Sequence, residues 1–135
     1  MKIHRFEEIQ AWQESRKLVN QIYETTQTNK DFNTDYRLIN QIQAAAVSTM
    51  SNIAEGFARR SNKEFIQFLF ISKSSAAEVQ SQLYVALDQN YINKTQFQTI
   101  YNQAETVSKL TSGFIKYLKN NGNQHNKPKQ PNKLV

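Results

Sequence analysis

Polar side chains accompany the apolar face of one predicted helix, residues 41–56, whose sequence is QIQAAAVSTMSNIAEG. Three of them follow helical steps beside its apolar stripe, and two more lie on the next predicted helix. A carboxylate near a core is costly unless it is paired or hydrogen-bonded. We therefore predict a polar network that fixes helix register, formed by Ser48, Asn52, Glu55, Ser75 and Glu78.

Glu55 and Glu78 are the only acids that we place near the interior, and paired carboxylates in helix bundles can hold two metal ions. Such centres use Glu-x-x-His pairs from facing helices, whereas the only histidines, His4 and His125, lie near the termini. The chain has no cysteine, no serine in a Gly-x-Ser-x-Gly turn and no glycine-rich phosphate loop. We therefore expect no enzyme activity, no bound metal and no cofactor.

Three bases within five residues, Arg59, Arg60 and Lys63, form a second cluster. They fall at the turn between the second and third predicted helices, beside a helix start, where partial positive charge favours anions. Bases at such a place can hold phosphate oxygens of RNA or DNA. The three bases alone favour the alternative interpretation, a solvated turn, and the phosphate interpretation needs support from elsewhere in the sequence.

The formal net charge of +6 is concentrated at the C-terminus. Residues 119–135 contain four lysines and no acid, which leaves 13 bases and 11 acids elsewhere, a net charge of +2. This segment has few apolar residues, so we expect a disordered basic tail. It either solubilises the protein or adds auxiliary phosphate contacts through Lys127, Lys129 and Lys133.

The residue pattern predicts one all-α domain over residues 1–118. Gly56 is the only glycine before residue 113, and no proline precedes residue 128, which favours long uninterrupted helices. Apolar residues recur at helical steps over about 7–26, 36–57, 62–89 and 94–119. Short connections between four amphipathic helices predict an antiparallel up-down-up-down four-helix bundle.

Helix starts are marked by capping residues. Ser61 with Glu64, and Asn93 with Gln96, have the spacing of capping boxes, in which the cap and the third helical residue each accept a backbone N–H. Thr34 or Asp35 is the predicted cap of the second helix.

The run SNIAEG at 51–56, followed by the three bases and by Glu64 and Phe65, resembles the 23S rRNA intervening-sequence family of small bacterial four-helix-bundle proteins. The superfamily of that family includes the accessory variability determinant of diversity-generating retroelements. The resemblance extends from about Phe6 to Leu118. It implies a ring-like homopentamer linked to nucleic acid, and it implies that the polar network serves fold and assembly.

Two functions remain open at this stage. The first is a non-catalytic scaffold or accessory factor that binds the RNA or DNA backbone. The second is a protein-interaction module that docks onto a partner enzyme, such as a reverse transcriptase, through apolar residues off the core stripe, among them Phe70, Ile71 and Tyr84. The lack of cysteine and of any apolar run near about 20 residues predicts a cytoplasmic protein without a membrane span.

Overall fold

The computed structural model describes residues 2–121, and this part of the chain contains helices and no strand. The prediction of an all-α protein is thus confirmed. A short 3-10 helix, η1, spans Phe6–Glu8 and precedes five α-helices. These are α1 (Gln10–Thr28), α2 (Lys30–Thr34), α3 (Tyr36–Phe57), α4 (Asn62–Asp88) and α5 (Lys94–Asn120).

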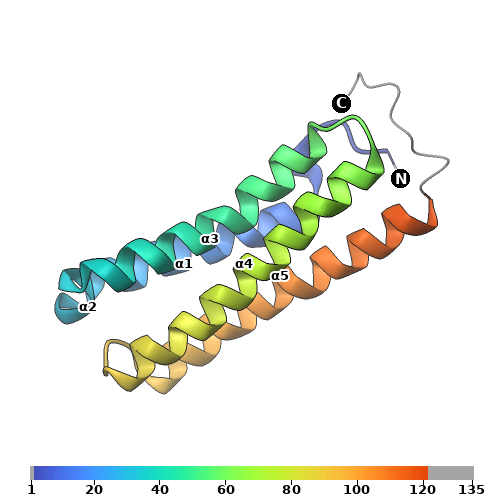
Figure 1. Cartoon of the computed structure of the whole chain (residues 1–135). Helices are drawn as coiled ribbons and strands as arrows, with labels where there is room; N and C mark the ends of the chain where they lie inside the picture. The colour runs from blue at the N-terminus through green and yellow to red at the C-terminus, as the bar shows by residue number, and fades with distance from the viewer. Residues whose placement is uncertain (1, 122–135) are drawn as a thin grey trace.

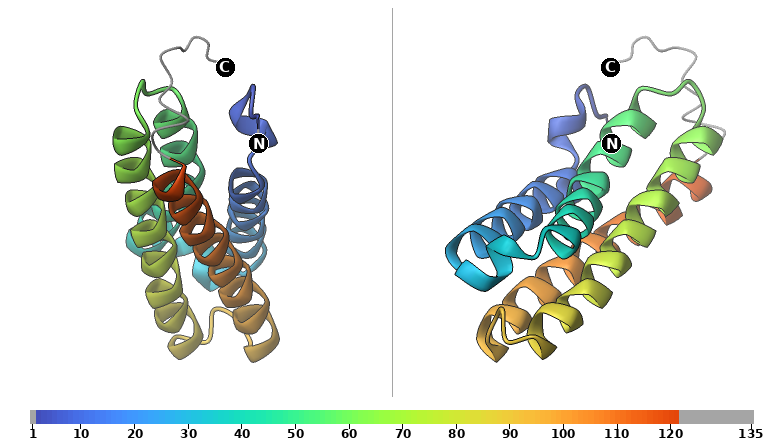
Figure 2. Two further views of the ribbon diagram at one scale, coloured as in Figure 1. Left: turned by 90° about the vertical axis from the view of Figure 1, so that its right-hand side faces the viewer. Right: turned by 60° about the vertical axis from the view of Figure 1, so that its left-hand side comes forward.

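The four long helices lie side by side, and successive long helices run in opposite directions (Figure 1). In the two further views, α3 packs between α1 and α4, and α5 completes the set by packing against α4 and α1 (Figure 2). The turn between α3 and α4 lies at the same end as the N-terminal segment. The short helix α2 and the turn between α4 and α5 lie at the opposite end (Figure 1).

The first helix differs from its predicted range of 7–26, because α1 begins at Gln10 and runs to Thr28. The connection between the first two predicted helices contains α2, which sequence periodicity alone does not reveal. Asn29 caps this helix by accepting the Phe32 N–H at 2.8 Å, and Phe32 is 1% exposed in the core. Burial of one large aromatic side chain stabilises a turn of helix that is otherwise too short to persist.

The helix caps follow the predicted residues with one difference. Asn93 and Gln96 form a reciprocal capping box, and Asp35 accepts the Leu38 N–H at 3.1 Å. Ser61 accepts the Glu64 N–H at 3.2 Å, but the Glu64 carboxylate accepts the Ser61 hydroxyl at 3.3 Å. The predicted box at Ser61 is therefore only half formed. At the C-terminal end, α5 continues to Asn120, so the tail predicted from 119 begins with helical residues.

A layer of four fully buried hydroxyl side chains divides the core into two apolar clusters. Each long helix contributes one of these residues: Ser15, Thr49, Ser72 and Thr111. Along each helix, the buried apolar residues on one side of this hydroxyl belong to one cluster, and those on the other side belong to the second cluster. Three of these hydroxyls donate to a carbonyl of their own helix. The fourth, Ser72 on α4, donates to the Thr49 carbonyl of α3 at 2.7 Å. The layer is thus hydrogen-bonded without any charge.

Helices α3 and α4 pack closely at Gly56. A Cβ atom at this position would lie 2.7 Å from the Phe68 Cβ and 2.8 Å from the Phe65 Cδ1. Because a Cβ is fixed to its backbone, rotation of a side chain cannot relieve the contact with Phe68. Glycine at position 56 is therefore required for the spacing of the two helices, in contrast to Gly113, around which there is open space.

We predict that Gly56→Ala lowers the free energy of unfolding by roughly 1–3 kcal/mol, the usual cost of overpacking. The matched control, Gly113→Ala, adds the same methyl group to α5 without a clash and should raise stability by up to about 1 kcal/mol through helix propensity. Urea unfolding followed by circular dichroism measures both. Equal effects of the two substitutions would contradict the close approach at Gly56.

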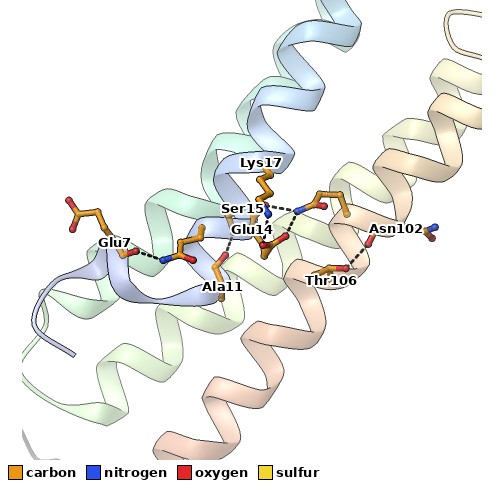
Figure 3. Close-up of polar contacts among 9 residues, drawn as sticks. Glu7, Ala11, Glu14, Ser15, Lys17, Asn102 and Thr106 are labelled. Carbon is orange, nitrogen blue, oxygen red and sulfur yellow. Dashed lines mark hydrogen bonds and ion pairs between the residues drawn. The ribbon is translucent and has the colours of Figure 1, made fainter. Parts of the chain in front are cut away.

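Contact between α1 and α5 includes a polar cluster around Glu14 (Figure 3). Gln103 of α5 donates to both the Glu14 carbonyl and its carboxylate at 2.9 Å, and Lys17 lies 3.0 Å from the same carboxylate. The hydrogen bond from Gln103, together with that from Lys17, lowers the pKa of Glu14 below its ordinary value of 4.5. The charged form of Glu14 therefore stabilises the folded state.

A depressed folded-state pKa contributes stability above the unfolded value of 4.5, and that contribution is lost as the pH falls through the lowered pKa. We expect Glu14→Gln to cost about 1 kcal/mol near neutral pH, the net worth of one hydrogen bond. The difference between wild type and variant should shrink in acid. Urea titrations at neutral and acidic pH measure it, and a difference that does not change with pH would exclude this role.

Candidate nucleic-acid interface

The basic turn, defined here as residues 58–63, links the end of α3 to the first residues of α4. Arg60 and Lys63 are exposed, and Arg59 is partly buried. The structure therefore brings the three predicted bases to one end of the bundle, at the start of a 27-residue helix. Aligned peptide dipoles give such a helix start a partial positive charge that adds to the charge of the side chains.

Arg59 is held in place by contacts with both flanking helices. Its guanidinium lies 3.4 Å from the Glu55 carboxylate of α3 and 4.6 Å from the ring centroid of Phe68 on α4. A guanidinium has five N–H donors, so these contacts leave donors free for a ligand. Phe68 is also the residue that abuts Gly56, and the helix contact thereby positions the arginine.

Backbone groups at the start of α4 are only partly satisfied. Ser61 accepts the Glu64 N–H through its side chain and the Phe65 N–H through its carbonyl. The N–H groups of Asn62 and Lys63 precede the first intrahelical acceptors, as in any helix start. Glu64 carries a negative charge in this first turn, while Glu55 is paired with Arg59, so Arg60 and Lys63 supply the local excess of positive charge.

The predicted polar network is present for three of its five members. Ser75 of α4 donates to the Ser48 hydroxyl of α3 at 2.8 Å, and Asn52 donates to the Ser48 carbonyl and hydroxyl at 2.9 Å. Together these bonds link α3 to α4 through neutral groups.

Glu55 and Glu78 do not join this network, and their predicted place near the interior is wrong. Both residues are exposed. Glu55 contacts Arg59 instead, and Glu78 accepts the Gln82 amide at 3.3 Å. Asn52 already lies at the edge of the packed face, so a further helical step carries Glu55 into solvent, where a carboxylate avoids the desolvation cost. Among residues 2–121, no group of three or more acids and histidines is arranged to hold a metal ion.

Two residues that could belong to a functional site are not predicted from the sequence. Asn62 is 5% exposed, and neither amide atom has a hydrogen-bond partner in the described part of the chain. It is a polar residue at the start of the predicted helix, and only its helical spacing to Phe65 and Leu69 indicates burial. Val85 joins Phe70, Ile71 and Tyr84 in the outer face of α4, with exposures between 45% and 51%. Phe70 and Tyr84 are fourteen residues apart, as are Ile71 and Val85, and this spacing of four helical turns would have identified Val85 as a member of the same face.

The auxiliary tail candidates Lys127, Lys129 and Lys133 lie outside the described residues. Within residues 2–121, no helix combines the length and the apolar character needed to cross a bilayer.

Comparison with known proteins identifies relatives of this fold. A crystal structure of a protein of unknown function from the S23 ribosomal protein family of Bacteroides thetaiotaomicron matches with a TM-score of 0.73 and 24% identity, over 78% of this chain and 98% of that chain. At this identity the match shows a shared fold. No curated protein shows significant similarity to the chain. The family model described as 23S rRNA-intervening sequence protein matches residues 7–113, and the chain therefore belongs to that family.

Proposed function

We propose that this protein binds the sugar-phosphate backbone of nucleic acid through the basic turn and acts as a non-catalytic scaffold or accessory factor. The observation that carries the proposal is the convergence of Arg59, Arg60 and Lys63 at one exposed end, beside the start of α4. Membership of a family named for an rRNA-intervening sequence supports RNA as the first ligand to test.

The mode of binding follows from the chemistry of the turn. Arginine and lysine contact phosphate oxygens, which position a protein on nucleic acid without reading its sequence. Binding to phosphates releases condensed counterions, so affinity falls as salt rises. We therefore expect weak base specificity and a steep salt dependence, with the tail lysines Lys127, Lys129 and Lys133 as auxiliary contacts.

Oligomerisation is the second part of the proposal. We propose that the helices form an antiparallel up-down-up-down four-helix bundle, and that bundles assemble as a ring-like homopentamer in the cytoplasm. The outer face of α4 supports assembly, because its four large apolar side chains are exposed in the single chain. Copies of a weak basic turn around one axis would bind a polyanion with high avidity.

A protein-interaction module is the second candidate function. The same outer face of α4 favours it: Phe70 with Ile71, and Tyr84 with Val85, offer two exposed apolar pairs to a helix of a partner such as a reverse transcriptase. Ala77 and Glu78 lie between the two pairs. In that case the basic turn is a solvated connection, and variants of the turn would leave partner binding unchanged.

We predict that Arg60→Glu with Lys63→Glu weakens RNA binding at low salt by about tenfold or more, equivalent to about 1.4 kcal/mol, because two attractive charges become repulsive. The salt dependence should also fall, by roughly one unit of slope for each phosphate that the variant fails to neutralise. Fluorescence anisotropy with structured RNA and duplex DNA measures both. Arg59 is left intact because it packs against Phe68.

The matched control is Lys30→Glu with Lys94→Glu, which makes the same change in net charge at the other end of the bundle, on exposed residues. This control should bind nearly as well as wild type. Equal losses in both variants would mean that net charge alone drives binding, and unchanged binding in the turn variant would refute the proposed interface.

For assembly, we expect Ile71→Lys with Val85→Lys to reduce the molar mass in solution, because charges would be buried in the proposed contact. Both residues are exposed, so helix content should stay unchanged. Light scattering after size exclusion measures the mass, with Thr99→Lys and Thr106→Lys on exposed positions of α5 as the control pair. An unchanged mass in the α4 variant would remove this face from the assembly.

A further inference from the structure

We infer that the Arg59 guanidinium, held over the ring of Phe68, is a platform on which one unpaired base of the nucleic acid stacks. The basic turn then selects single-stranded nucleic acid over duplex. The inference rests on the proposed function above and specifies which form of nucleic acid the turn binds.

Two helices fix the plane of the Arg59 guanidinium. Its central carbon lies 4.6 Å from the ring centroid of Phe68 on α4, over the ring, and one terminal nitrogen lies 3.4 Å from the Glu55 carboxylate of α3. The Arg59 side chain is nonetheless 42% exposed. Because Phe68 covers one face of the planar group and Glu55 meets it at a nitrogen, the opposite face remains open to a ligand.

The ion pair makes Arg59 a poorer phosphate ligand than its neighbours. Glu55 is 57% exposed and stands beside the guanidinium, so its negative charge repels a phosphate that approaches Arg59. An uncharged base meets no such repulsion. Arg60 and Lys63 are exposed, and neither is in an ion pair within residues 2–121. We therefore assign the phosphates of the strand to Arg60 and Lys63, and a base to Arg59.

A guanidinium plane suits the face of a base. Proteins that recognise unpaired nucleotides stack the bases on aromatic rings or on arginine planes, and every base offers such a face, so the contact tolerates any sequence. In a duplex, each internal base is already stacked between its neighbours and offers only its edges. A stack of Phe68, Arg59 and a base can therefore form with a single strand or a loop, and not with the interior of a duplex.

Charge alone predicts the opposite preference. A duplex has a high density of phosphates and releases more counterions for each phosphate neutralised than a single strand does. A protein that contacts only phosphates therefore binds a duplex at least as tightly as a single strand at the same salt concentration. Tighter binding to the single strand would identify a contact with bases.

The test compares three RNAs of equal strand length: an unstructured single strand, the duplex of the same sequence, and an abasic single strand with the same phosphates. In fluorescence anisotropy at low salt, the full chain should bind the single strand about fivefold more tightly than either of the others, as one stacked base allows. Arg59→Lys keeps the charge and removes the plane. It should lose this preference, with duplex affinity and salt dependence unchanged.

The matched control is Arg16→Lys, because Arg16 is also exposed and lies 5.9 Å from the ring centroid of Trp12, but on α1, outside the basic turn. It should bind all three RNAs as wild type does. A second measurement uses wild type alone: the Arg59 Nε–H resonance should move upfield when the single strand is added, because a stacked base shields it, and not when the abasic strand is added.

Three results would overturn the inference and leave the proposed function standing. They are wild-type binding to the duplex at least as tight as to the single strand, a preference that survives in Arg59→Lys, and equal losses in Arg59→Lys and Arg16→Lys. Binding of none of the three RNAs by wild type would refute the inference and the proposed function together.

Discussion

The contact between α3 and α4 at Gly56 constrains both the packing of this protein and the geometry of its basic turn. No space exists for a Cβ between Gly56 and Phe68, so the Gly56 backbone packs directly against the Phe68 side chain near the end where the chain reverses. Phe68, fixed by that contact, supports the Arg59 guanidinium. Gly56 of α3 thus determines, through Phe68 of α4, where the Arg59 side chain is held. The geometry of the candidate site therefore depends on the packing of α3 against α4.

Polar groups in the interior follow a consistent physical rule. The buried hydroxyls of Ser15, Thr49, Ser72 and Thr111 donate to carbonyls, and Ser48, Asn52 and Ser75 satisfy one another across α3 and α4. These groups are neutral, so they specify register without the desolvation cost of charge. The Glu55 and Glu78 carboxylates remain at the surface, and Asn62 stands apart as a buried polar side chain with neither amide atom paired.

Much of the fold can be predicted from sequence because periodicity and caps are local signals. The α3 and α5 starts follow from Asp35 and Asn93, whose side chains bind nearby N–H groups. The helix α2 escapes prediction because tertiary burial of Phe32 stabilises it. At the candidate site, clustering of Arg59, Arg60 and Lys63 is visible in the sequence, but the burial of Asn62 and the exposure of Glu55 depend on how α3 and α4 are rotated, which spacing along one helix does not determine.

Chemical-shift mapping tests the central claim most directly, since it locates the bound surface residue by residue. Amide spectra of the nitrogen-15-labelled full chain would be recorded while structured RNA is added at low salt. Our account predicts that the largest shifts cluster at residues 59–64, around the basic turn and the first turn of α4, and that they diminish as salt is added. Shifts confined to residues 122–135, or to the outer face of α4 around Ile71 and Val85, would contradict it.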